Sequence, residues 1–177
     1  MAEVVIVESP EAGGVLVAGH IATQVRADPE FTLGVATGST PLPVYAALER
    51  ERAAGLDFSA VTAFALDEYV GLPRDHPESY HSVIRREVTE PLGFDPARVH
   101  VADGDEATIA TAGERYEAAL AAHGGVDLQL LGIGTDGHVG FNEPGSSLAS
   151  STRVKTHTAR TRADNARFFE TAGQVPT

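Results

Sequence analysis

Short β-branched runs alternate with longer amphipathic stretches along the whole chain. The short runs predict strands at 4–7, 32–36, 61–66, 99–101 and 128–133, the last being the most convincing buried strand. The longer stretches predict helices at 10–26, 41–54, 79–90 and 107–123, with the third ending before Pro91. Residues 153–158 are expected to be extended and 162–171 helical. The alternation predicts an α/β fold, an open and mostly parallel doubly wound (Rossmann-like) sheet with helices on both faces.

One domain accounts for this pattern, because the 177 residues contain no repeat and no low-complexity linker. The chain ends at Thr177, where the pattern leads us to expect another strand. A parallel sheet with a missing edge leaves backbone groups unpaired. We therefore expect residues 1–177 to form a single domain that is incomplete at its C-terminus.

The charge balance limits the possible partners. The chain carries 13 basic and 25 acidic side chains, a net charge of −12, which argues against binding to nucleic acid or to anionic membranes. A small phosphorylated ligand stays compatible, because helix ends and arginines bind phosphate locally. Cysteine is absent, which excludes disulfides and thiolate chemistry. Neither a signal peptide nor a membrane span is recognisable, so we expect a cytoplasmic protein.

A loop of small residues follows the second predicted strand. The segment 37–40, Thr-Gly-Ser-Thr, stands between that strand and a helix that begins at Pro41. Free backbone N–H groups and the helix dipole at such a place bind phosphate. The same residues suit an ordinary helix cap equally well, and the Gly-Lys-Ser/Thr of a Walker A loop is absent.

Asp67 comes directly after the third predicted strand. In an open α/β sheet, a carboxylate at that place faces the crevice where ligands bind. Partial loss of solvent raises its pKa and makes it a candidate base for removing a proton from carbon. Capping a turn is the commoner role of an aspartate at a strand end, and the residue alone leaves both open. Glu68 and Tyr69 are assigned to packing or hydrogen bonding around it.

The longest candidate loop follows the fifth predicted strand and is rich in glycine. Its spacing matches the G-x-G-x-x-G of dinucleotide-binding proteins, but Gly140 and Pro144 forbid the helix that this motif requires. The glycines instead let the backbone turn tightly and bring Asp136, His138 and Glu143 together. A histidine flanked by two carboxylates is suited to proton transfer, because one carboxylate fixes the tautomer while the imidazole exchanges a proton.

Two other uses of these side chains are possible. A single loop histidine more often makes hydrogen bonds only, and Asp, His and Glu together can bind a metal ion. No H-E-x-x-H occurs, and the other histidines show no ligand spacing, so no metal is expected.

Basic residues gather late in an otherwise acidic chain. They form either a solvated helix face or an anion-binding segment that folds over a phosphorylated ligand. Their position next to the glycine-rich loop favours the second interpretation. Five of the 13 basic residues lie here: Arg153, Lys155, Arg160, Arg162 and Arg167.

Taken together, these segments resemble the glucosamine-6-phosphate deaminase family. The matching stretches follow the order of the family along the whole chain, and the DGHxGFNEP block is highly specific to it. They are ATGSTP (36–41), LDEYVGL (66–72), HPESYHS (76–82), LLGIGTDGHVGFNEPGSSL (130–148) and TRVKT with TRADNARFF (152–169).

The resemblance implies a reaction of amino-sugar (N-acetylglucosamine) catabolism. Glucosamine 6-phosphate becomes fructose 6-phosphate and ammonia, with no metal or organic cofactor. His138 then opens the pyranose ring as base and acid, and Asp136 and Glu143 orient and tune it. Asp67 removes the C2 proton, giving an enolamine whose reprotonation and hydrolysis release ammonia.

The resemblance also implies binding positions. Gly38, Ser39, Thr40 and Arg167 match positions that hold the substrate or its phosphate. N-acetylglucosamine 6-phosphate activates some members at a second site, which Ser146, Arg153, Lys155 and Thr156 match. Members commonly form homo-oligomeric rings. They also continue into a Gly-x-x-Lys-Ala segment with a phosphate-binding lysine, which this chain does not reach, so we expect weaker phosphate binding and stability here.

Two rival functions are weaker. A 6-phosphogluconolactonase shares the fold and a GxDGH loop, but it carries different residues at 67–69 and 141–144 and needs no base at C2. A sugar-phosphate sensor of a bacterial regulator would carry a basic helix-turn-helix segment, and none precedes this domain. It would also have little need of Asp67, Asp136 and His138 together.

Overall fold

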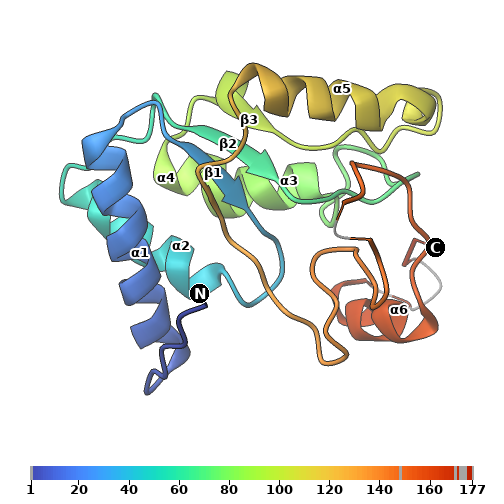
Figure 1. The fold of residues 1–177 in the computed structure, drawn as a ribbon, viewed down its shortest axis with the longest axis horizontal. Helices are drawn as coiled ribbons and strands as arrows, with labels where there is room; N and C mark the ends of the chain where they lie inside the picture. The colour runs from blue at the N-terminus through green and yellow to red at the C-terminus, as the bar shows by residue number, and fades with distance from the viewer. Residues whose placement is uncertain (1, 148, 170, 172–174, 177) are drawn as a thin grey trace.

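The computed structural model describes residues 2–147, 149–169, 171, 175 and 176, which form an α/β fold (Figure 1). Its four-stranded sheet has the order β3-β2-β1-β4, and every neighbouring pair is parallel. This confirms the predicted open parallel sheet. The strands are β1 (Thr32–Val35), β2 (Thr62–Ala65), β3 (Val99–His100) and β4 (Leu128–Gln129).

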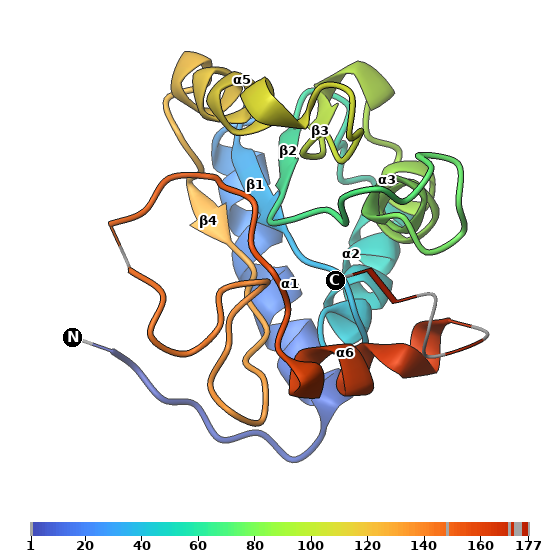
Figure 2. The ribbon, with the colours of Figure 1, turned by 90° about the vertical axis from the view of Figure 1, so that its right-hand side faces the viewer.

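Helices cover both faces of the sheet, as Figures 1 and 2 show. Leu33 and Ala63 belong to the core on one face, whereas Phe64 contacts Tyr116 of α5 on the other, with 5.7 Å between the ring centroids. This alternation is the period-two pattern of a strand buried on both sides. The first face carries α1 (Pro10–Ala27), α2 (Leu42–Ala53), α3 (Tyr80–Ile84) and α4 (Glu90–Leu92), and the second carries α5 (Ile109–Ala122).

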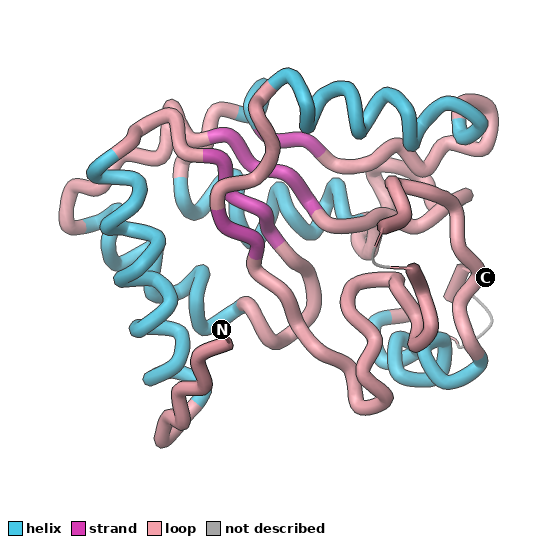
Figure 3. Tube along the Cα trace, viewed as in Figure 1, coloured by secondary structure: helices cyan, strands magenta, loops and turns pink. Residues whose placement is uncertain are grey.

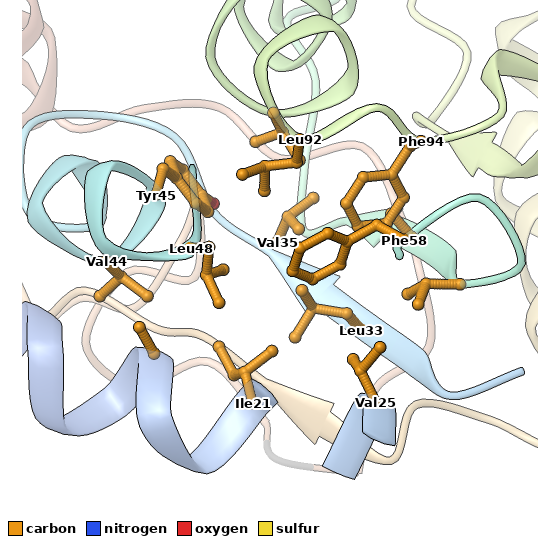
Figure 4. Close-up of a cluster of buried hydrophobic side chains, with 14 of the residues drawn as sticks. Ile21, Val25, Leu33, Val35, Val44, Tyr45, Leu48, Phe58, Leu92 and Phe94 are labelled. Carbon is orange, nitrogen blue, oxygen red and sulfur yellow. The ribbon is translucent and has the colours of Figure 1, made fainter. Parts of the chain in front are cut away.

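The main core lies between α1, α2 and β1, and Figure 4 shows part of it. Ile21, Leu33 and Leu48 are fully buried there. The two helices approach closely, since a Cβ atom at Gly14 would lie 2.5 Å from the carbonyl carbon of Pro43. The Tyr45 hydroxyl donates to the Ala36 carbonyl at 2.7 Å and accepts from its N–H at 3.0 Å. Helix α2 thereby fixes the carboxyl end of β1.

Most predicted elements are confirmed with ends shifted by one or two residues. The helices predicted at 10–26, 41–54 and 107–123 are α1, α2 and α5, and three of the short runs are β1, β2 and β3. Ser9 caps α1 by accepting a hydrogen bond from the Ala12 N–H at 3.1 Å, and Pro10 follows at the first helical position.

The strand predicted at 4–7 is wrong. This segment is coil, and Val4 and Ile6 are 84% and 93% exposed. β-branched residues favour a strand only where a neighbouring strand is available to pair with, and no strand in the described part of the chain pairs with these residues.

The prediction of a long buried strand at 128–133 is also wrong in extent. Only the first two residues form β4, and Leu131 and Ile133 are 53% and 79% exposed. Strand β4 pairs with β1 alone within the described residues. The last pair is Gln129 with Gly34, and the Leu130 N–H still donates to the Gly34 carbonyl at 2.9 Å, so the ladder ends there although β1 continues to Val35.

The helix predicted at 79–90 is interrupted and continues past Pro91. Helix α3 passes into a π-helical turn, η1 (Arg85–Thr89), and then into α4, which ends at Gly93 with φ 71°. The shift in hydrogen bonding within η1 lets the chain keep turning through Pro91, so this proline lies inside the last turn. A 3₁₀ turn, η2 (Pro96–Arg98), then leads into β3.

Loops dominate the C-terminal part of the chain (Figure 3). Residues 153–157 belong to no strand. The predicted helix at 162–171 starts earlier and ends earlier, as α6 (Ala159–Asn165) followed by the 3₁₀ turn η3 (Ala166–Phe168). Thr158 sets the start, because its hydroxyl accepts from the Thr161 N–H at 3.2 Å. The end of the predicted range includes Glu170, which lies outside the described residues.

Among the described helices, none combines the length and the apolar character needed to cross a membrane. The assignment of residues 1–177 to one domain stays a prediction.

Truncating the core should destabilise the chain. Leu48 is fully buried between α1, α2 and the sheet, so Leu48→Ala leaves a cavity and should lower the free energy of unfolding by about 2–5 kcal/mol. Leu16→Ala is the matched control, because Leu16 is 42% exposed on α1, and it should cost no more than about 0.5 kcal/mol. Urea unfolding followed by circular dichroism measures both, and equal losses would contradict the described core.

Candidate functional site

The loops after β1, β2 and β4 meet at the carboxyl edge of the sheet. Strand order reverses between β1 and β4, which is where ligands bind in open α/β folds. A cavity of about 300 Å³ lies there, lined by all three loops and by residues of η1, α6 and η3. Asp67, His138, Arg167 and the 38–40 segment all line it. The structure thus brings together candidates from the three loops and from the basic C-terminal segment.

Asp67 sits at the inner wall of this cavity. Burial raises the pKa of its carboxyl to about 7, the negative charge of Glu68 adds to the rise, and a hydrogen bond from the Phe141 N–H partly offsets it. Gly140 allows this approach, since a Cβ atom there would lie 3.0 Å from the Asp67 Oδ2 atom and its φ is 57°. A carboxyl group that ionises near neutral pH is suited to act as a general base.

His138 and Asp136 form a hydrogen-bonded pair at the outer side of the site. The His138 Nδ1 atom lies 2.7 Å from the Asp136 Oδ1 atom, and the same oxygen accepts from the His138 N–H at 3.2 Å. Hydrogen bonds from the backbone and the ring of His138 lower the pKa of Asp136. An ionised Asp136 holds one ring nitrogen and leaves the other for proton exchange.

Glu143 completes this cluster. Its Oε1 atom accepts from the Thr158 N–H at 3.1 Å and from the Thr161 hydroxyl at 2.7 Å, while Oε2 is buried and has no hydrogen-bond partner among the described residues. Burial raises the pKa of Glu143, but the two threonines and the His138 charge outweigh it and hold the pKa below its usual value.

The three side chains lie close enough to act together. Each of Asp136, His138 and Glu143 contributes one atom to a group in which all atoms lie within 4.8 Å of one another. A nitrogen and two carboxylate oxygens are also ligands that a divalent cation accepts. The hydrogen bonds already described also suit the proton transfer that the sequence predicts, and this role stays a prediction.

The predicted phosphate-binding residues all line the cavity. The 38–40 segment is exposed at the start of α2, and Gly38 has a φ of 86°. Arg167 lies in η3, with its guanidinium carbon 4.8 Å from the centre of the Phe168 ring. Free N–H groups at a helix start and an arginine are suited to hold a phosphate.

The other basic residues do not converge on this cavity. Arg153 and Lys155 line a second cavity of about 520 Å³ behind Asp67. Arg160 donates to the Thr135 hydroxyl at 3.0 Å, and Arg162 to the Val175 carbonyl at 3.5 Å. Of the five late basic residues, Arg167 is therefore the one that lines the first cavity, and the prediction of an anion-binding segment rests on this residue.

The four positions assigned to an activator are only partly brought together. Arg153 and Lys155 share the second cavity, and the Arg153 guanidinium donates to the Asn142 side chain at 3.1 Å. Ser146 is half-buried in the turn that its N–H closes with the Glu143 carbonyl at 3.0 Å, and Thr156 is exposed. Neither is among the described residues that line the two cavities.

Several cavity residues were missed by the sequence reasoning. Tyr80, Phe141, Asn165 and Arg86 line the cavity. The first three lie inside the stretches that match the family, so the family resemblance could have identified them. Arg86 lies in the π-helical turn, and η1 has no recognisable signal in the sequence.

Comparison with known proteins gives a consistent picture. The family model described as glucosamine-6-phosphate isomerases/6-phosphogluconolactonase matches residues 10–166. A protein of Pseudarthrobacter chlorophenolicus named glucosamine-6-phosphate deaminase is 57% identical over 174 residues, which cover 98% of this chain and 67% of that protein. The chain thus spans about two thirds of the length of this relative.

Solved structures agree with the sequence comparison. A structure described as a monomeric glucosamine-6-phosphate deaminase matches with a TM-score of 0.95 and 35% identity, covering 99% of this chain and 73% of that one. A 6-phosphogluconolactonase from Trypanosoma brucei shares the fold, with a TM-score of 0.68 and 23% identity over 82% of this chain and 65% of its own. The chain belongs to the glucosamine-6-phosphate isomerase/6-phosphogluconolactonase family.

Proposed function

We propose that this chain converts glucosamine 6-phosphate into fructose 6-phosphate and ammonia. The observation that carries the proposal is the pairing of two kinds of proton-transfer group on one cavity. Asp67 is buried and has a raised pKa, whereas His138 is held by an ionised carboxylate. An aldose–ketose isomerisation needs both, because a proton must leave an oxygen to open the ring and another must leave carbon.

The substrate phosphate is placed at the start of α2. The 38–40 segment supplies N–H groups and hydroxyls, and Arg167 lines the same cavity. The sugar ring then extends toward Asp67 and His138. The cavity of about 300 Å³ is within the range of small-molecule sites.

Ring opening is assigned to His138. It takes the proton from the C1 hydroxyl and returns a proton to the ring oxygen, which leaves a free aldehyde at C1. Asp136 fixes the ring through the Nδ1 atom, and Glu143 stabilises the imidazolium form through its unpaired oxygen.

Asp67 then removes the proton from C2. Protonation of the C1 oxygen gives an enolamine, and return of a proton to C1 gives an imine at C2. Water adds to that imine and ammonia leaves, so no redox partner is needed. A carboxylate with a pKa of about 7 is a stronger base than an ordinary aspartate and is still ionised in part at neutral pH.

Regulation and assembly are separate proposals. Arg153 and Lys155 are suited to bind the phosphate of an activator such as N-acetylglucosamine 6-phosphate, and they share the second cavity. A homo-oligomer and a cytoplasmic location stay predictions, and one similar structure is described as monomeric.

Ammonia release from glucosamine 6-phosphate tests the function directly. Asp67→Asn removes the proposed base and should lower the rate by about 10²–10⁴-fold. Asp164→Asn is the matched control, because Asp164 is exposed on α6 and stands outside the described lining of the cavity; its rate should not change. Ammonia release that survives Asp67→Asn contradicts the assignment. The proposed function is overturned if neither this chain nor a version extended to the length of its relatives releases ammonia. It is also overturned if the chain hydrolyses a lactone instead.

The pH dependence of kcat/KM should report Asp67. The base works only when it is ionised, and burial raises its pKa, so activity is present above and lost as pH falls through about 7. Below that midpoint, kcat/KM should fall about tenfold per pH unit. A rate profile between pH 5 and 9 checks this, and an acid limb near the ordinary aspartate value would show that Asp67 is not the base.

Removal of divalent cations should leave ammonia release unchanged. The proposed steps use side-chain proton transfers only, and the Nδ1 atom of His138 and Oε1 of Glu143 are already hydrogen-bonded within the protein. The measurement compares rates before and after dialysis against a chelator, with metal content recorded. A loss that added Zn²⁺ or Mn²⁺ restores would assign the Asp136–His138–Glu143 cluster to metal binding.

A further inference from the structure

Glu68 ties the loop that carries Asp67 to the start of α3. One carboxylate oxygen accepts from the Tyr69 N–H at 2.8 Å and the Tyr80 N–H at 2.9 Å, and the other accepts from the His81 N–H at 2.9 Å. The first N–H groups of a helix have no partner within the helix, and a negative charge is favourable there. Glu68 therefore replaces the missing partners of α3 with its own side chain.

The anchored helix start also reaches the substrate cavity. Tyr80 is the first residue of α3 and lines the cavity, and its hydroxyl interacts with the Thr37 side chain in the loop after β1. Its hydroxyl also lies 3.5 Å from the Tyr69 hydroxyl. Through α3, Glu68 thus links the loop after β2 to the loop after β1, and both loops form the site.

Glu68 is half-buried, and its carboxylate is held by N–H donors. Burial raises the pKa of Glu68 above its usual value, and the N–H groups of Tyr80, His81 and Tyr69 and the charge of Arg74 limit that rise. Three N–H donors stabilise the ionised form of a carboxylate and not the neutral form.

The surroundings of Asp67 make Glu68 its dominant charged neighbour. Burial raises the pKa of Tyr69, Tyr80 of α3 and Tyr116 of α5, so these hydroxyls stay neutral at physiological pH. Phe141 offers only its backbone N–H. The other titratable or charged residues lining the two cavities at Asp67 are Tyr45, Glu78, Arg86, Glu87, His138, Arg167, Asp103, Glu114, Glu117, Arg153, Lys155 and His157.

We propose that Glu68 is a positioning residue, which fixes the Asp67 carboxyl toward the cavity and places a negative charge beside it. The inference rests on the proposed function, in which Asp67 is the base. The geometric part acts through the three N–H hydrogen bonds, and the electrostatic part acts through the charge that makes Asp67 harder to ionise and a stronger base.

Two variants separate these parts. Glu68→Gln removes the charge and keeps one acceptor oxygen, so the acid limb of kcat/KM should move below its midpoint in the unaltered chain, and the plateau of kcat should fall severalfold. Glu68→Asp keeps the charge but is one methylene too short to hold both α3 N–H groups. Its acid limb should stay in place, while kcat falls and the Tyr80 and His81 amides exchange faster with deuterium.

Glu106→Gln is the matched control. Glu106 is exposed, and its Oε1 atom would lie 3.2 Å from a Cβ atom at Gly71, so it removes a charge beside the same loop without touching Asp67. Its acid limb and kcat should match those of the unaltered chain. A limb that does not move in Glu68→Gln, or that moves equally in Glu106→Gln, overturns the electrostatic part. A merely structural role would lower kcat and leave the limb unmoved.

A direct titration keeps this test separate from the proposed function. The Asp67 carboxyl carbon, labelled with ¹³C and assigned with Asp67→Asn, should titrate at lower pH in Glu68→Gln than in the unaltered chain, whether or not ammonia is released. Equal midpoints overturn the proposal. If Glu68→Gln does not fold, Glu68→Asp decides, and unchanged amide exchange at Tyr80 and His81 together with an undiminished kcat would overturn it.

Discussion

The burial of one carboxyl group, that of Asp67, is the constraint on which the site depends. Raising its pKa from 3.8 to about 7 corresponds to about 4 kcal/mol of lost stability when the group is ionised. Asp67 is held at this place because it follows β2, which is buried on both faces. The glycine-rich loop must also close over it, which requires Gly140 at that contact. A protein selected for stability alone would not keep a carboxylate there.

The two acid–base groups of the site differ because their environments differ. Asp67 lies against the core, where desolvation strengthens it as a base, whereas Asp136 is exposed and its pKa is lowered by hydrogen bonds to His138. The proposed function uses the first carboxylate to take a proton from carbon and the second to hold an imidazole. This separation of two carboxylates by environment is how one site supplies both a carbon base and an oxygen acid. A lactone hydrolysis has no use for the first of them.

Elements whose position is set by their own residues could be predicted from local sequence patterns. Ser9 and Pro10 set the start of α1, and Asp67 and the glycine-rich loop could be placed at strand ends from the alternation of elements. Features that depend on distant partners could not be predicted. Residues 4–7 have the composition of a strand but no described strand pairs with them, and the pairing of β4 with β1 ends at Gln129. The Glu68 hydrogen bonds to α3 span 12 and 13 residues and leave no local signature.

Tyr69 connects the loop after β2 to the C-terminal segment that carries Arg167. Its ring lies 5.0 Å from that of Phe141 and 5.7 Å from that of Phe169, and its hydroxyl accepts from the Asn165 side chain at 3.0 Å. Each aromatic pair contributes about 0.5–1.5 kcal/mol beyond the area it buries. The short α6–η3 segment, which carries Arg167, belongs to no sheet and depends on such contacts for its position. The loop that presents Asp67 therefore also holds the arginine proposed to bind the phosphate, so binding and proton abstraction share one support.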